Sequence, residues 1–195
     1  MTISGKHAGG LGLGVLLALV ASVSVASAAP LAMVPGDVAP EVRGDTSLGQ
    51  RKVVDFSETR LTLLNFWATW CEPCKQEMPV LEELHQTRED LQVIGVMHDS
   101  VENEQMQAFL ESLGVSYTVV RPLLRVTKAY GGVGALPTTI LIDSDGRVVR
   151  RYVGATEEQL EGLIRDVDDA LAGRKLKEMV FPDRINAVTD LDRPK

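Results

Sequence analysis

The chain has 195 residues, of which 45 % are hydrophobic, and it carries 20 Lys and Arg against 27 Asp and Glu, for a formal net charge of −7. This length suits one folded domain with a well-filled core and short extensions. The acidic balance argues against nucleic acid as a partner, because phosphate binding relies on clustered Lys and Arg.

Residues 1–28 have the pattern of a signal peptide for export. Lys6 and His7 precede an apolar run over residues 11–25, and the Ala-Ser-Ala sequence at 26–28 has the small residues of a cleavage site. An uncleaved membrane anchor is the alternative, because the run with its flanking small residues approaches the roughly 20 residues that span a bilayer. In both cases the rest of the chain is delivered outside the cytoplasm.

The next segments predict a linker and the first strands. Residues 29–40 contain three prolines and a glycine and are predicted to be a linker. Strand-like pieces between residues 41 and 55 predict a hairpin added in front of the core fold. The apolar run over residues 61–67 has the length of a strand and is typical of a central strand covered on both faces.

Two cysteines, Cys71 and Cys74, follow this strand and are the only ones in the chain. They begin a predicted helix on which Met78, Leu81 and Leu84 recur at helical spacing. A cysteine in the first helical turn faces unpaired backbone N–H groups and the positive end of the helix dipole, which favour the thiolate. Cys74 lies one turn further and can attack a mixed disulfide formed at Cys71. The pattern therefore predicts a two-electron dithiol/disulfide couple.

Two other interpretations of the cysteine pair remain. A structural zinc site needs two further thiolates or imidazoles. The chain has no third cysteine, and His7, His85 and His98 show no spacing typical of ligands. An inert buried pair is the other alternative. The redox couple is the favoured interpretation.

Strand and helix patterns alternate beyond the first helix. Residues 91–97 predict a buried strand, and Asp99-Ser100 is a suitable N-cap for a helix that Gly114 ends. A short strand over 117–120 and a short helix over 123–130 follow.

The C-terminal part of the domain has a hairpin and a last helix. The predicted strands 138–143 and 147–153 flank a Ser-Asp-Gly turn, and Thr156 is a suitable cap for a helix that carries apolar residues through Leu171. The alternation of strands and helices predicts an α/β domain over residues 41–173, and residues 174–195 form a C-terminal tail.

Two motifs of this chain resemble those of the thioredoxin-like superfamily. Within it, they resemble the motifs of the exported TlpA-like and ResA-like thiol-disulfide oxidoreductases. The first, FWATWCEPCKQEMP, covers residues 66–79, and the second, GALPTT, covers residues 134–139. The similarity extends over about residues 38–172. It implies a thioredoxin-like fold with a central mixed sheet flanked by helices and an added N-terminal hairpin.

The resemblance also implies roles for individual residues. Cys71 is the attacking thiol and Cys74 the resolving one, and together they form the redox-active disulfide. Pro137 matches the family's cis-proline beside the dithiol, where it presents the backbone of Leu136 to an extended partner strand. Trp70 is expected to shield the dithiol and to offer contact surface for substrates.

One departure from thioredoxins concerns the acid near the cysteines. Thioredoxins proper carry a buried aspartate where this chain has Asn65, which cannot exchange a proton. Glu77, three residues after Cys74, matches the glutamate that ResA-like proteins hold near their thiols. We therefore expect Glu77 to tune the pKa of the pair and to relay the proton during resolution, with a solvated helix glutamate as the alternative.

The resemblance implies an enzyme of the bacterial periplasm that needs no cofactor and no metal. Glu72 does not stabilise a neighbouring thiolate, so the couple is expected to be a reductant or mild exchanger. The implied partners are disulfide-bearing exported proteins, such as apocytochrome c or cytochrome oxidase copper-assembly proteins, and a membrane thiol-reductant donor.

Two other functions use the same residues. The alternative function is an extracytoplasmic copper chaperone that binds Cu(I) through both thiolates. Copper assembly proteins of related fold favour a wider cysteine spacing and a distant histidine, and neither is evident here. A peroxidase is the third, but the threonine-x-x-cysteine site of such relatives is absent.

Overall fold

A computed structural model describes residues 33–122 and 125–176 of the chain. Within them lies a seven-stranded sheet with the strand order β2-β1-β5-β4-β3-β6-β7. The strands are β1 (Arg43–Thr46), β2 (Arg51–Val53), β3 (Leu61–Trp67), β4 (Leu91–Met97), β5 (Thr118–Pro122), β6 (Thr138–Asp143) and β7 (Val148–Val153). The helices are η1 (Phe56–Glu58), α1 (Glu72–Thr87), α2 (Asn103–Ser112), α3 (Arg125–Ala129) and α4 (Glu157–Leu171).

The sheet is mixed. Strands β3, β4 and β5 run parallel to one another, whereas β6 and β7 on one side and β1 and β2 on the other pair antiparallel. The predicted thioredoxin-like architecture is therefore confirmed, including the hairpin that precedes the core. Because β3 is central, all seven of its residues are buried, as its continuous apolar run predicts.

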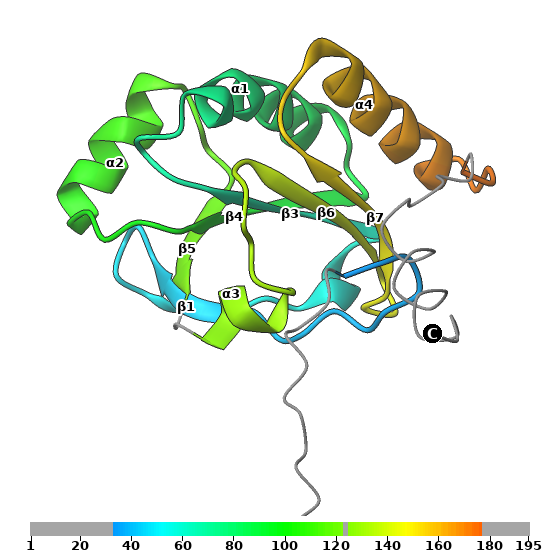
Figure 1. The fold of residues 1–195 in the computed structure, drawn as a ribbon, viewed down its shortest axis with the longest axis horizontal. Coiled ribbons are helices and arrows are strands. Elements are labelled where there is room, and N and C mark those ends of the chain that lie inside the picture. Colours follow the sequence, from blue (N-terminus) through cyan, green and yellow to red (C-terminus); the bar gives the residue numbers. More distant parts are fainter. Residues whose placement is uncertain (1–32, 123–124, 177–195) are drawn as a thin grey trace, which may run out of the picture.

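Two hydrophobic cores lie on the two faces of this sheet. Successive side chains of a strand point to opposite faces, so Leu63 and Trp67 of β3 pack beneath α1, α2 and α4, whereas Leu64 and Phe66 pack on the side of α3 (Figure 1). This alternation also places Asn65 on the α1 face.

The predicted capping of the last helix is confirmed. The Thr156 hydroxyl accepts a hydrogen bond from the Gln159 N–H at 3.3 Å, and the Gln159 side chain accepts one from the Thr156 N–H at 3.0 Å. Both groups satisfy N–H donors that the first helical turn leaves unpaired.

The predicted capping of α2 is wrong. The helix begins at Asn103, and its N-cap, Glu102, makes no side-chain capping bond. The carboxylate of Asp99 accepts hydrogen bonds from Thr69 instead. Asp99 therefore forms a tertiary contact with Thr69, just beyond the end of β3, instead of capping α2.

Part of the predicted linker belongs to the folded domain. Met33 and Ala39 are buried, the Gly36 N–H donates to the carbonyl of Val148 at 2.8 Å, and Val38 forms a bridge with Arg147. The folded unit therefore begins before residue 41. The predicted signal peptide and residues 177–195 of the tail lie outside the described residues.

Candidate functional site

A disulfide joins Cys71 and Cys74 where the chain passes from β3 into α1. Cys71 is the N-cap of α1, and its Sγ accepts the Cys74 N–H at 3.3 Å. Pro73 fits the first turn because its missing N–H would have no helical partner there. Cys71 is 4 % exposed and Cys74 is 0 % exposed, so Cys71 is the more accessible of the two residues.

The loop that leads into the disulfide is fixed to the end of β4. The His98 N–H donates to the carbonyl of Trp67 at 2.8 Å. Two residues further, the Thr69 N–H donates to Asp99 Oδ2 at 2.9 Å, and the Thr69 hydroxyl donates to the same oxygen. Trp70, between this anchor and Cys71, is 68 % exposed and presents a large apolar surface beside the sulfurs.

The second motif is brought to the same end of the sheet. The peptide bond between Leu136 and Pro137 is cis, and the carbonyl of Pro137 accepts the Gly154 N–H at 2.9 Å. Thr138 is paired with Phe66, so the cis bond lies beside the end of β3, from which the disulfide loop departs. Within the described residues, the Leu136 backbone makes no hydrogen bond, which leaves it available to an added strand.

Glu77 is a buried carboxyl group and not a solvated one. Its side chain, 1 % exposed, accepts hydrogen bonds from the Asn65 amide at 2.7 Å and from the Thr139 hydroxyl at 2.8 Å. Burial raises the pKa of Glu77 to about 7, although the bonds from Thr139 and Asn65 act in the opposite direction. An acid with this pKa can exchange a proton near neutral pH, and it lies one turn beyond Cys74 on α1.

Sequence reasoning missed three residues of this arrangement. The local sequence pattern predicts that Asp99 caps a helix, and it indicates no role for Thr69 or Thr139. The available signal was topological, because the carboxyl ends of the parallel strands β3 and β4 meet at one edge of the sheet. A carboxylate directly after β4 therefore had to lie near the loop that follows β3.

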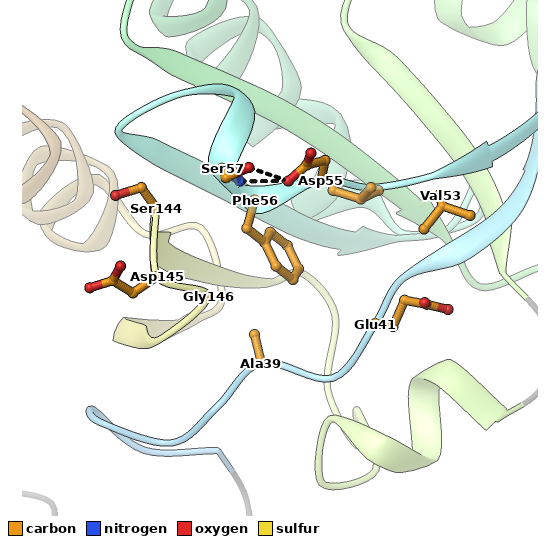
Figure 2. A pocket seen from close by; sticks show the side chains of 10 residues that line it. Ala39, Glu41, Val53, Asp55, Phe56, Ser57, Ser144, Asp145 and Gly146 are labelled. Atoms are coloured by element: carbon orange, nitrogen blue, oxygen red, sulfur yellow. Dashed lines mark hydrogen bonds between the residues drawn. The ribbon is translucent and has the colours of Figure 1, made fainter.

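A separate pocket of about 590 Å³ lies at the other end of the sheet (Figure 2). Phe56, Asp55 and Ala39 line it together with the β6–β7 turn at residues 144–146. Since β3 begins beside Asp143 and ends beside Thr138, the pocket and the disulfide lie at opposite ends of β3. None of the predicted site residues lines this pocket.

Within residues 33–122 and 125–176, no group of three or more His, Cys, Asp or Glu side chains could hold a metal ion. In the same part of the chain, none of the helices combines the length and the apolar character needed to cross a bilayer.

Comparison with known proteins gives a consistent result. The family model described as Redoxin matches residues 34–171. The thiol-disulfide oxidoreductase ResA of Bacillus thuringiensis (strain Al Hakam) is 38 % identical over 106 residues, which cover 53 % of this chain and 61 % of that protein. The thioredoxin-like protein YneN of Bacillus subtilis is 32 % identical over 130 residues, covering 65 % of this chain and 76 % of that one.

Solved structures show the same fold. A Chlorobium tepidum protein assigned as the thiol:disulfide interchange protein DsbE superposes with a TM-score of 0.65 and 28 % identity, over 72 % of this chain and 99 % of that one. The match to ResA, in contrast, spans only about three fifths of the length of that relative.

Proposed function

The chain belongs to the Redoxin family, and on that premise we propose that it is an extracytoplasmic thiol-disulfide oxidoreductase that reduces disulfides of partner proteins. One observation carries the proposal. A disulfide at the first turn of α1 lies at the same sheet end as a cis-proline and beside an exposed tryptophan. A nucleophile, a resolving group and a surface for an extended substrate are thereby combined.

The first step uses the reduced form, with Cys71 as thiolate and Cys74 as thiol. The N–H groups of the first turn of α1 and the helix dipole stabilise negative charge on Cys71. The Cys71 thiolate attacks one sulfur of the substrate disulfide, and the other substrate sulfur leaves as a thiolate that takes a proton from water. The product is a mixed disulfide at Cys71.

The second step releases the substrate. Cys74 loses its proton to the carboxylate of Glu77 and attacks the Cys71 sulfur. The bond to the substrate sulfur breaks, and this sulfur leaves as a thiolate that takes a proton from water, so that the substrate is fully reduced. Two electrons have passed to the substrate, and the enzyme holds the Cys71–Cys74 disulfide. Glu77 suits this transfer because its pKa of about 7 lets it hold or release a proton near neutral pH.

Net electron flow in this proposal runs outward to substrates. Glu72, between the two cysteines in sequence, does not favour a neighbouring thiolate, and its ion pair with Lys75 at 2.9 Å offsets part of its charge. The reduced form is therefore not specially stabilised, as a reductant requires. A membrane thiol-reductant donor would restore the dithiol after each cycle.

The proposed location is the periplasm, and the proposed substrates are exported proteins with oxidised cysteine pairs, among them apocytochrome c and cytochrome oxidase copper-assembly proteins. The N-terminal sequence pattern and the resemblance to the exported ResA-like proteins support this location. Recognition would rest on Trp70 and on the free backbone of Leu136.

Trapping of the mixed disulfide tests the proposal. In Cys74→Ala, the reduced protein should form an adduct with a disulfide-bearing model protein, and dithiothreitol should release it. Cys71→Ala is the matched control and should form no such adduct, because the accessible sulfur is lost. Equal adduct yields from the two variants would contradict the proposed role of Cys71. The absence of an adduct in Cys74→Ala, both without Cu(I) and with Cu(I) added to address the copper-chaperone alternative, would contradict the proposed oxidoreductase.

A further inference from the structure

Three buried side chains from three elements form a closed hydrogen-bonded ring below the disulfide. Asn65 of β3 donates to Glu77 Oε2 at 2.7 Å and to Thr139 Oγ1 at 2.8 Å, and the Thr139 hydroxyl donates to Glu77 Oε1 at 2.8 Å. All three side chains are at most 1 % exposed. The ring is fixed by the fold, because Asn65 and Thr139 are paired residues of β3 and β6.

The hydrogen bonds of this ring all lead to the Glu77 carboxylate, either directly or through the Thr139 hydroxyl. The Asn65 amide has two N–H groups, and one is used on Glu77 and the other on Thr139. Because the Thr139 oxygen already accepts from Asn65, its single hydrogen is left for Glu77. Asn65 therefore acts on Glu77 both directly and by orienting the hydroxyl of Thr139.

The unused atom of Asn65 agrees with this orientation. Among the described residues, no group donates to Asn65 Oδ1, although that atom is buried. Rotating the amide by 180° would place this oxygen against a carboxylate oxygen, and two acceptors repel each other. The strand pairing fixes the position of Asn65, and the contact with the Glu77 carboxylate determines which way its amide group is turned.

We propose that Asn65 and Thr139 are positioning residues that hold the Glu77 side chain as a ready proton acceptor for Cys74. This inference rests on the proposed function and adds to it. Burial alone favours the neutral acid, whereas the donors from Asn65 and Thr139 favour the carboxylate. Because the two effects oppose each other, the acid and the carboxylate forms of Glu77 stay close in free energy. The side chain can therefore both take up and release a proton.

Tyr117 is a further titratable group near this ring. The pKa of its hydroxyl is raised, mainly by burial and then by the charges of Glu77 and Glu82. The Tyr117 hydroxyl therefore stays protonated when Glu77 ionises. Glu82 is occupied by hydrogen bonds from Ser116 and Gln86, so it does not compete for the donors of the ring.

The test compares two substitutions at one position. Thr139→Val removes the hydroxyl at nearly constant volume, and Thr139→Ser keeps it. Infrared spectroscopy follows the carboxyl stretch of Glu77 in the oxidised protein as the pH is changed, and the midpoint of this titration is measured. The band is identified by its loss in Glu77→Gln. Thr139→Val should weaken the acidity of Glu77 roughly tenfold, because one hydrogen bond to the charged form is lost. Thr139→Ser should restore the original midpoint.

Thr62→Val is the matched control. Thr62 is another buried threonine of the sheet, and among the described residues its hydroxyl has no partner. An unchanged midpoint in Thr139→Val, or an equal change in Thr62→Val, overturns the proposal. If Thr139→Val does not fold, Asn65→Ala replaces it and should weaken the acidity of Glu77 at least as much.

A second readout separates this inference from the proposed function. The rate at which Cys74 resolves a preformed mixed disulfide at Cys71 should shift its pH profile in Thr139→Val, and Thr139→Ser should recover it. An unshifted profile in Thr139→Val overturns the relay. Wild-type protein that fails to reduce any disulfide contradicts the proposed function, whereas the infrared titration still decides whether the ring controls Glu77.

Discussion

Individual residues of the site work under opposing physical effects. Glu77 is the main example, because its burial destabilises the charge that its two hydrogen-bond donors stabilise. In Asp99, hydrogen bonds from Thr69 to Oδ2 stabilise the side chain, whereas the buried Oδ1, which has no partner within the described part of the chain, destabilises it. Glu77 is buried and Asp99 is held by Thr69, so neither side chain is a freely exposed carboxyl group.

The raised pKa of Glu77 predicts a pH-dependent stability. A carboxyl with a folded pKa of about 7 and an unfolded value near 4.5 binds more protons when folded, so stability falls as pH rises from 4.5 to 7. The loss should amount to about 3 kcal/mol, and Glu77→Gln should lack it. Urea unfolding of both oxidised proteins at pH 5 and pH 7.5 measures the difference. Identical pH dependences would show that Glu77 does not titrate in this range.

The anchor of the disulfide loop gives a second prediction. Asp99→Ala leaves the N–H and hydroxyl of Thr69 without their acceptor, which should cost about 2 kcal/mol and loosen the approach to Cys71. We expect slower reduction of a protein disulfide with a smaller effect on a small-molecule disulfide. Asp99→Asn keeps one acceptor oxygen and serves as the control. Equal rates in Asp99→Ala and wild type would remove Asp99 from the site.

At the scale of elements, periodicity and turn chemistry predict most of the fold. The continuous apolar runs of β3 and β4 and the capping box at Thr156 give the element boundaries that the structure shows. The start of α2 could not be predicted from local sequence, because Asp99 bonds across to Thr69. The same limit applies to Thr139, whose role depends on the pairing of β6 with β3.

Close packing between strands gives a prediction at Gly95 of β4. A methyl group there would lie 2.9 Å from both the Trp67 indole nitrogen and a Val119 methyl. Gly95→Ala should therefore destabilise the protein by about 2 kcal/mol through overpacking. Gly162→Ala is the control, because its methyl would have ordinary contacts within α4 and should stabilise by roughly 0.5–1 kcal/mol. Thermal unfolding compares the two, and a neutral Gly95→Ala would contradict the packing argument.

At the scale of the whole molecule, the N-terminal segment at residues 33–40 is part of the structure. It fills the α3-side core with Met33 and Ala39, and it exchanges backbone hydrogen bonds with the start of β7. The proline content of this segment predicted a linker, but the burial of its apolar residues depends on distant parts of the chain, which composition does not describe.

Removal of this segment should therefore cost stability. A chain that starts at residue 41 loses the burial of Met33 and the bonds of Gly36 and Ala39 to β7 and its turn. We expect it to be about 3 kcal/mol less stable than a chain that starts at residue 33. Urea unfolding of the two measures this difference, and coincident midpoints would show that residues 33–40 contribute nothing.

The N-terminal segment meets the sheet at the β6–β7 turn, and the sulfurs lie beyond the opposite end of β3. Seven residues of extended chain place roughly 20 Å between these two poles. Residues 33–40 therefore pack at the pole remote from the sulfurs. Under the proposed function, a substrate protein that approaches the disulfide pole does not meet this segment.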